Sequence, residues 1–301
     1  MSKADLKKRS LGRFSSSFFP IFYLLFINIG FVDGAWASEI PQRLISMSPN
    51  FTENLYDIGA QNQLIGVTDF CRFPPEAKLK EKVGGYYNPN IEKIVSLKPD
   101  RVLLLPFHSD TIKTLQKLNI PVFIQDDSTL KDVFESYDRL GRLLGREKQA
   151  GAAKKRLQDG IERIRQKAQQ RKTVSILFVV GHDAGTLRQM YAAGPRSFVD
   201  EIIILCGGKN IMAGSGIPYP LVSKEQLIGQ DPDVIVDSMP SDQSTKGMVE
   251  NARKEWNKVT SLKAVREHHI YYLTRDEDLI PGPTLLGLAQ SLDEIFDSVS
   301  K

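Results

Sequence analysis

Aromatic side chains gather in irregular loops of this chain, where they could bind a ligand. The loops at residues 68–75, 84–89, 106–108 and 214–220 combine aromatics with glycines or prolines, a composition that is too irregular for the interior of a helix or strand. Aromatic rings bind ligands through wide apolar faces and need few hydrogen bonds. The candidate residues are Phe70, Tyr86, Tyr87, Phe107 and Tyr219.

Three further side chains could coordinate a metal. Cys71 follows Phe70, and its thiolate would be a soft ligand for cobalt or iron in a bound complex, although we favour a neutral side chain that lines the binding site. His108 and His182 stand in loops of different halves of the chain and could ligate a haem or a metal. Since isolated histidines are mostly hydrogen-bonded structural residues, we favour that role for each.

Two glutamates, Glu92 and Glu225, open short helices that belong to a repeated unit. In residues 90–104 and 223–236 the Glu begins an apolar-periodic helix, a Pro-Asp pair ends it eight residues later, and branched aliphatic residues follow. A capping residue precedes each Glu, whose carboxylate favours the positive end of the helix dipole. Two copies of one helix-turn-strand unit predict two similar α/β lobes.

The remaining elements place the aromatic loops. Branched apolar runs entered from a helix suit parallel strands buried on both faces. The aromatic loops of the first half follow such strands and lie at the sheet edge where α/β proteins bind ligands. A single aromatic ring in a loop would be explained by ordinary packing, so the prediction of a binding site rests on the position that these loops share. We predict strands at 43–47, 64–67, 102–105, 122–125, 174–180, 234–236 and 270–273, and helices at 49–58, 111–118, 198–205 and 284–299.

A helical segment separates the two halves. Apolar residues at helical spacing begin at Leu130, Gly145 interrupts them, and a charged helical stretch continues to about Arg171. Twenty-five helical residues span about 35–40 Å, more than one small lobe. We therefore predict a helix that runs between the lobes. The predicted domains are a signal peptide at 1–37, an N-terminal α/β lobe at 38–129, an inter-lobe helical segment at 130–172 and a C-terminal α/β lobe at 173–301.

The N-terminus has the pattern of a secretory signal. Basic residues lie before residue 14, an apolar run covers 18–32, and Ala35-Trp36-Ala37 is a small-x-small cleavage site, so we expect cleavage after Ala37 and export to the periplasm. A retained membrane anchor is the alternative. We disfavour the anchor because the apolar run is short for a membrane-spanning helix. A lipoprotein is also disfavoured, because no Cys lies near the cleavage point.

Charge and motifs exclude several functions. Residues 1–37 contain five Lys or Arg and two Asp or Glu, so their removal lowers the formal net charge from +4 to about +1 and leaves no electrostatic case for nucleic-acid binding. The sequence has no Gly-x-Ser-x-Gly, His-Glu-x-x-His or phosphate-binding glycine motif, which argues against an enzyme.

Cys71 and Cys206 fall in different lobes, and we expect them to be unpaired.

An ordered set of motifs resembles one family. The motifs are Arg43 to Pro49 with Thr52-Glu53, Phe73 to Ala77, the first repeated unit, Ala193 to Pro195 before a helix that ends at Gly207 to Ile211, and Tyr219 to Gln226. Together, from about residue 42 to the C-terminus, they resemble the periplasmic substrate-binding proteins of ABC importers for vitamin B12, iron siderophores and haem, and among these the vitamin B12 carriers.

The resemblance implies an α/β fold of class III type, with two Rossmann-like lobes that have parallel central sheets and are joined by one long rigid helix. It implies a monomer without intrinsic cofactor, which holds a small-molecule ligand in the cleft between the lobes. Its partner would be the permease and ATPase complex of an ABC importer at the inner membrane. The expected ligand is a cobalt corrinoid of the vitamin B12 type, with an iron siderophore or haem as the alternative.

The resemblance also assigns roles to residues. Phe70, Tyr86 and Tyr219 match aromatics that face the ligand, and Asp276 matches a polar ligand-facing residue. Glu92 and Glu225 match carboxylates that dock on permease arginines. Two of the three aromatic positions, Tyr86 and Tyr219, have tyrosine where the family has tryptophan, and Thr284 stands where the family often has arginine. Because of these differences, an iron siderophore or haem stays a possible ligand beside the corrinoid. The full predicted cleft comprises Phe70, Cys71, Tyr86, Tyr87, Phe107, His182, Tyr219 and Asp276.

A metal-ion carrier or a metalloenzyme is the alternative of another class. Either needs three or four convergent His, Asp or Glu ligands. The chain has four histidines, and the adjacent His268 and His269 would point to opposite faces of a strand, so we disfavour this alternative and predict no protein-bound metal.

Overall fold

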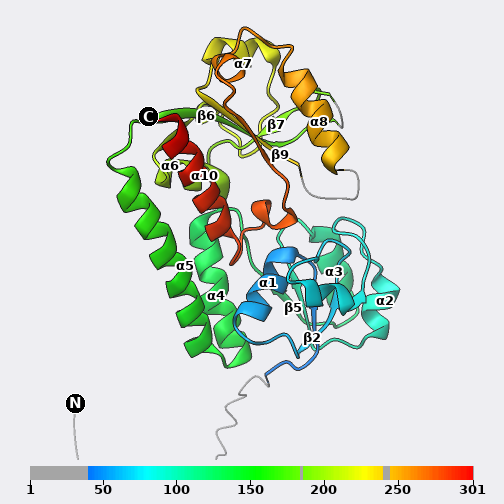
Figure 1. The fold of residues 1–301 in the computed structure, drawn as a ribbon. Helices are drawn as coiled ribbons and strands as arrows, with labels where there is room; N and C mark the ends of the chain where they lie inside the picture. The colour runs from blue at the N-terminus through cyan, green and yellow to red at the C-terminus, as the bar shows by residue number, and fades with distance from the viewer. Residues whose placement is uncertain (1–39, 184–185, 240–244, 301) are drawn as a thin grey trace, which may run out of the picture. The chain divides into compact units, whose positions relative to one another are not determined.

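A computed structural model of the chain describes residues 40–183, 186–239 and 245–300 (Figure 1). The predicted signal peptide and its cleavage site lie outside these residues. Two sheets, each with its own helices, form a first and a second lobe. None of the helices in the described ranges is long and apolar enough to cross a lipid bilayer.

The first lobe is built on a fully parallel sheet in the order β3-β2-β1-β4-β5. The chain enters at the central strand β1, moves outward through β2 and β3, and returns to the other side of β1 with β4. The loops after β1 and β4 therefore diverge and leave a crevice at the carboxyl edge of the sheet. The elements are β1 (Leu44–Ser46), α1 (Pro49–Asp57), β2 (Leu64–Val67), η1 (Pro75–Leu79), β3 (Glu81–Lys82), α2 (Ile91–Ser96), β4 (Arg101–Leu104), α3 (Ser109–Lys117) and β5 (Val122–Ile124).

The second lobe has the order β10-β9-β6-β7, with β8 also paired to β6. Its strands are parallel except the two-residue edge strand β7, which runs antiparallel to β6. The parallel central sheet predicted for this lobe is confirmed. The elements are β6 (Val174–Gly181), β7 (Tyr191–Ala192), α6 (Phe198–Leu205), β8 (Gly208–Asn210), α7 (Lys224–Gln230), β9 (Val234–Ser238), α8 (Thr245–Trp256), α9 (Lys263–Arg266) and β10 (Ile270–Leu273).

Two successive helices, with the predicted break at Gly145, form the segment between the two sheets, and the second is the long inter-lobe helix. Figure 1 shows α4 (Leu130–Leu144) and α5 (Glu147–Ala168) side by side, and Gly145 between them has φ 62°, the left-handed conformation that ends a helix. With 22 residues, α5 is about 33 Å long and corresponds to the predicted inter-lobe helix. The chain ends with the 3-10 helix η2 (Asp276–Leu279) and with α10 (Leu285–Val299), which packs on α5 and α6.

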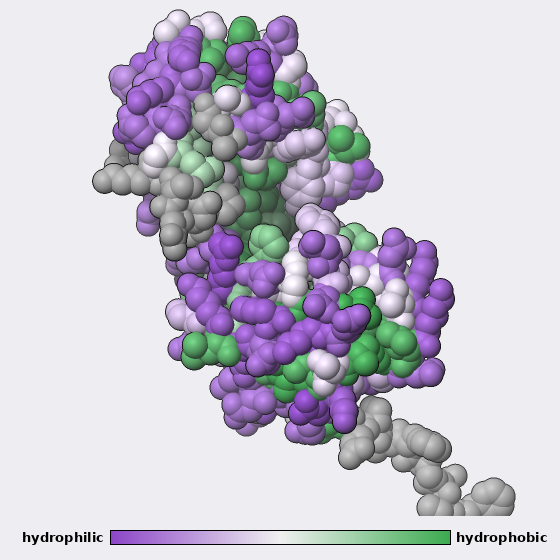
Figure 2. All heavy atoms as spheres, turned by 90° about the vertical axis from the view of Figure 1, so that its right-hand side faces the viewer, coloured by the Kyte–Doolittle hydropathy of each residue, from purple (hydrophilic) through white to green (hydrophobic). Residues whose placement is uncertain are grey.

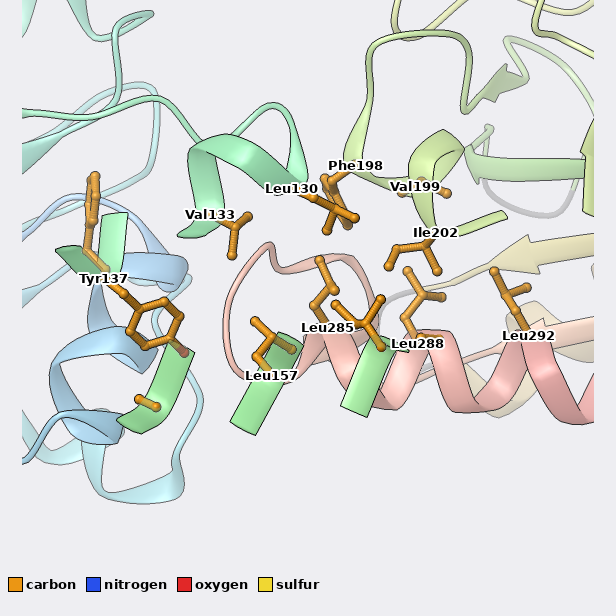
Figure 3. Packing of buried hydrophobic residues seen from close by; sticks show 14 of the residues in the cluster. Leu130, Val133, Tyr137, Leu157, Phe198, Val199, Ile202, Leu285, Leu288 and Leu292 are labelled. Atoms are coloured by element: carbon orange, nitrogen blue, oxygen red, sulfur yellow. The ribbon is translucent and has the colours of Figure 1, made fainter. Parts of the chain in front are cut away.

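One apolar core passes through these helices. Figure 3 shows side chains of α4, α5, α6 and α10 pointing toward one another, among them Leu130, Leu157, Ile202 and Leu288. The same cluster includes residues of β1 in the first lobe and of β6 in the second. Because the core is continuous, the residues from Ile40 onward form one compact unit.

Ion pairs of Arg171, three residues after the end of α5, hold this end of the helix against α10. The Arg171 side chain, only 5% exposed, pairs with Asp293 and Asp297 of α10. It also donates to the carbonyl oxygen of Cys206 at the end of α6, at 2.9 Å. Cys206 is fully buried and unpaired, as predicted. Arg171 therefore fixes the end of the inter-lobe helix to both neighbouring helices.

The repeated unit has the same capping in both lobes. The Asn90 side chain accepts the backbone N–H of Lys93 at 2.9 Å, and Ser223 accepts that of Gln226 at 3.0 Å, which confirms both predicted caps. Each unit then turns in the left-handed region directly before its proline, at Lys98 (φ 46°) and at Asp231 (φ 37°). Proline disfavours the right-handed helical region for the residue before it, which is why both helices end by this point.

The aspartate of each Pro-Asp pair ties its helix to the central strand of its own lobe. The Asp100 carboxylate accepts the backbone N–H groups of Gln42 and Arg43, just before β1, at 2.8 and 2.9 Å. The Asp233 carboxylate accepts the N–H of Ser175 in β6 at 2.8 Å. The two units are thus equivalent in three dimensions as well as in sequence.

Glu53 joins α1 to the segment that returns from the second lobe. Its carboxyl group is 2% exposed and accepts the Thr284 hydroxyl at 2.7 Å, while its other oxygen has no hydrogen-bond partner in the described part of the chain. Burial raises the pKa of Glu53 to about 8, against the lowering effect of the Thr284 hydrogen bond. At neutral pH this contact therefore contains a protonated acid.

We predict that Asp233→Asn lowers the free energy of unfolding by about 2 kcal/mol near pH 7. Burial opposes ionisation of Asp233, but hydrogen bonds from Lys263 and Ser175 outweigh it and lower the pKa to about 2. The contribution is present above the unfolded pKa and is lost as the pH falls from about 4 toward 2. Urea unfolding of wild type and variant at several pH values measures this. The exposed Asp110→Asn is the control, and an equal deficit at neutral and acid pH would contradict the prediction.

We predict that Glu53→Gln stabilises the protein at alkaline pH. The folded pKa of Glu53 lies above its unfolded value, so the wild type loses stability as the pH rises from about 4.5 through 8. The glutamine still accepts from Thr284 and carries no charge to bury. Thermal unfolding should show the variant ahead by a few kcal/mol near pH 8 and level with wild type near pH 5. The exposed Glu76→Gln should show no such gap, and a constant gap across pH would refute the assignment.

A candidate ligand-binding cleft

A cavity of about 200 Å³ opens at the carboxyl edge of the first sheet. The loops after β1, β2, β3 and β5 line it, and the segment after η2 covers it from the side of the second lobe. Figure 2 shows hydrophobic surface in the recess between the two lobes. We call this cavity the cleft. Its lining includes Ser48, Asn50, Phe70, Tyr86, Asp127 and Ile280.

Tyr86 is the centre of an aromatic cluster at the cleft. Its ring centroid lies 5.0 Å from Phe107, 5.1 Å from Tyr87 and 6.3 Å from Phe70. Phe70 and Phe107 are about half exposed, and Tyr87 is 81% exposed. Three loops that are separate in sequence therefore form one aromatic surface open to solvent. Such exposure of large apolar rings is typical of a binding site.

His108 supports this surface from below. Its ring is buried, with Nε2 3.0 Å from the carbonyl oxygen of Tyr86 and Nδ1 bonded to the backbone of Leu105. Burial lowers the pKa of His108, which favours a neutral ring. The structural role predicted for His108 is confirmed, and its effect is to fix the loop that carries Tyr86.

The Asp127 charge acts on two tyrosines, Tyr86 of the first lobe and Tyr219 of the second. Burial and then the Asp127 charge raise the pKa of Tyr219 to about 12, and the same two causes raise the pKa of Tyr86. Burial and then the charges of Asp126 and Asp132 raise the pKa of Asp127 to about 7. Asp127 therefore lies within electrostatic range of a tyrosine from each lobe.

Two predicted cleft residues lie elsewhere. Cys71 is fully buried in the apolar core, with Sγ 3.2 Å from the Thr68 hydroxyl, because a turn from Thr68 folds it beneath its loop. The His182 side chain is 4% exposed, and its Nε2 lies 3.2 Å from Asp237 at the end of the neighbouring strand. A buried carboxylate needs partners, and Trp256 supplies another, so His182 belongs to the interior of the second lobe. The hydrogen bond to Asp237 raises its pKa.

Asp276 lies beside the cleft in an ion pair. Its carboxylate is 3.3 Å from Arg72, whose guanidinium lies 5.9 Å from the centre of the Phe70 ring. The pair links the loop after β2 to η2. Asp276 itself does not line the cavity, which in this part of the chain is lined by residues 279–281. Its ion pair with Arg72 instead contributes to the contact between the lobes near the aromatic surface.

Several cleft residues were not predicted. Ser48, Asn50 and Asp127 lie within three residues of the ends of predicted strands, and the rule that ligands bind at the carboxyl edge could have found them. Asn50 is 1% exposed, and within the described ranges neither polar atom of its side chain has a hydrogen-bond partner. An unsatisfied amide on the cleft wall is suited to bind a polar group of a ligand. In the same ranges, no three His, Cys, Asp or Glu side chains cluster as metal ligands do.

Curated proteins with similar sequences include several vitamin B12-binding proteins. The one from Vibrio parahaemolyticus is 26% identical over 279 residues, which cover 92% of this chain and 97% of that protein. The one from Pectobacterium carotovorum is 32% identical over 202 residues, which cover 66% of this chain and 72% of that protein.

Solved structures share the fold. The periplasmic vitamin B12-binding protein of Vibrio cholerae matches with a TM-score of 0.73 and 24% identity, over 87% of this chain and 99% of that one. A periplasmic haem-binding protein from Pseudomonas aeruginosa matches with a TM-score of 0.76 and 23% identity, over 87% and 94%. At these identities the likeness is one of fold, and it confirms the predicted two-lobed class III architecture.

The family profile described as a periplasmic binding protein matches residues 44–277, from the start of β1 into η2. This range contains both sheets and the loops that form the aromatic surface. The resemblance that the sequence motifs indicated is confirmed. The chain belongs to the periplasmic binding protein family.

Proposed function

We propose that this protein is the substrate-binding component of an ABC importer, which captures a corrinoid of the vitamin B12 type and delivers it to the permease. The observation that carries the proposal is the exposed aromatic surface around Tyr86. A corrinoid is a large, flat macrocycle, and apolar rings bind such a molecule by contact area. The vitamin B12-binding relatives support the same ligand.

The polar groups of the cleft support an uncharged ligand. Among the described residues that line the cavity there is no Lys, Arg or His, and Asp127 is the ionisable carboxyl group. Carboxylates of haem or of anionic siderophores would gain from a cationic partner there. The carboxamide side chains of a corrinoid need hydrogen-bonding groups, which Asn50 and Asp127 provide. The corrinoid is therefore favoured over the iron chelates.

The remaining features fit a periplasmic carrier. The protein acts as a monomer without catalytic activity or resident cofactor, and its signal peptide is cleaved after about Ala37. Its partners are the permease and ATPase complex at the inner membrane. Glu92 and Glu225 stand exposed on α2 and α7, and neither has an ion-pair partner in the ranges that the structure describes. We assign them to docking on cationic permease residues.

Calorimetric titration of the mature protein tests the ligand. Hydroxocobalamin should bind, and Phe70→Ala should weaken binding about 10- to 100-fold, equivalent to about 1.4–2.8 kcal/mol, because an exposed ring of the cleft wall is lost. Leu118→Ala removes a similarly exposed apolar side chain from the end of α3 and should leave the affinity unchanged. Heat from haemin or a ferric siderophore, with none from hydroxocobalamin, would overturn the corrinoid assignment.

Transport assays test the docking role. Glu92→Lys combined with Glu225→Lys should abolish corrinoid uptake, because the carboxylates no longer attract permease cations, while ligand affinity in solution stays unchanged. The control is Glu76→Lys with Glu250→Lys, which reverses one exposed charge on each lobe at sites outside the repeated units. Normal uptake by the double Glu92 and Glu225 variant would exclude the docking role.

A further inference from the structure

The two docking helices expose the same pair of side chains. In α2, Val95 lies three residues after Glu92, and in α7, Ile228 lies three residues after Glu225. Residues three apart are neighbours on the surface of a helix, so each carboxylate has a branched aliphatic side chain beside it. Val95 is 42% exposed and Ile228 is 47% exposed.

The same local structure holds both pairs in place. Ile94 and Leu227, each two residues after the glutamate, are 0% and 2% exposed and anchor the helix in its lobe. The caps and the Pro-Asp aspartates fix the two ends of each unit in equivalent ways. The exposed pairs are therefore presented on rigid supports.

Repetition separates these residues from ordinary surface aliphatics. A single exposed Val or Ile needs no explanation. Here a glutamate and an exposed aliphatic residue recur three residues apart on equivalent helices of both lobes. The residue just before each exposed aliphatic is buried in both helices. Lys93, adjacent to Glu92, is engaged by Glu81 at 2.7 Å, so it leaves the Glu92 carboxylate available to a partner.

We infer that Val95 and Ile228 form the apolar half of the permease-docking surface, and that the permease offers a cation beside an apolar patch to each lobe. This inference rests on the proposed docking role of Glu92 and Glu225. An aliphatic side chain buried next to an ion pair removes water from it, which strengthens the Coulomb attraction. The acid supplies attraction at a distance, and the aliphatic side chain stabilises the docked complex.

Binding of the loaded protein to its cognate permease and ATPase complex in nanodiscs tests the inference. Val95→Ser with Ile228→Ser should weaken this binding about tenfold or more, while hydroxocobalamin affinity and thermal stability stay unchanged. The control is Leu118→Ser with Ile204→Ser, which removes one similarly exposed aliphatic side chain from each lobe elsewhere on the surface.

Salt dependence separates the two halves of the surface. Added salt screens exposed charges, so Glu92→Gln with Glu225→Gln should flatten the dependence of binding on ionic strength. The Val95 and Ile228 variant should keep the wild-type slope at lower affinity. Unchanged affinity of that variant, or an equal loss in the control, would overturn the inference.

Two other outcomes have distinct meanings. Absence of binding by the wild type, together with normal hydroxocobalamin affinity, would remove the proposed docking role and the inference with it. Sedimentation that shows self-association of the wild type, abolished by Val95→Ser with Ile228→Ser, would assign the apolar pair to a contact between two copies of this chain and overturn the permease assignment.

Discussion

The packing of α5 against α10 and α6 is the constraint on which the cleft depends. A cleft between two lobes keeps a defined width only when the connection between them is stiff. Here the connection is a pair of helices within a continuous apolar core, closed at one end by the buried Arg171 with its two aspartates. The contact of Glu53 with Thr284 adds a second attachment beside the cleft itself.

The proposed ligand surface consists of loops of the first lobe and of a few residues from the segment after the second sheet. Contact area comes from rings gathered around Tyr86, and His108 holds the central loop in position. The polar groups that line the cleft are few. Among them are Asn50, whose side chain has no hydrogen-bond partner in the described residues, and Asp127, whose charge acts on Tyr86 and Tyr219. A large aromatic surface with sparse polar contacts suits a ligand that is broad, flat and uncharged.

The repeated unit connects the fold to the proposed recognition of the permease. Its aspartate receives backbone N–H groups at the central strand of each lobe, and its helix exposes a carboxylate with an aliphatic neighbour. The motif positions a helix on a sheet in each lobe, and we propose that it also gives both lobes the same surface for the permease.

The sequence by itself determined most of the strands and helices, the repeated unit with its caps, the helix break at Gly145 and the family, but it did not predict the short strands β3, β7 and β8 or the helices α8 and α9. The features that it determined follow from periodicity, proline and glycine chemistry, and capping, which act over a few residues. Tertiary structure decided which loop side chains meet. Cys71 and His182 stand in loops of the kind that bind ligands, but neither faces the cleft. A turn at Thr68 buries Cys71, and a hydrogen bond to the buried Asp237 holds His182 inside the second lobe. Asn50 and Asp127 line the cleft because strands far apart in sequence end at one edge, which is a matter of sheet order and not of local pattern.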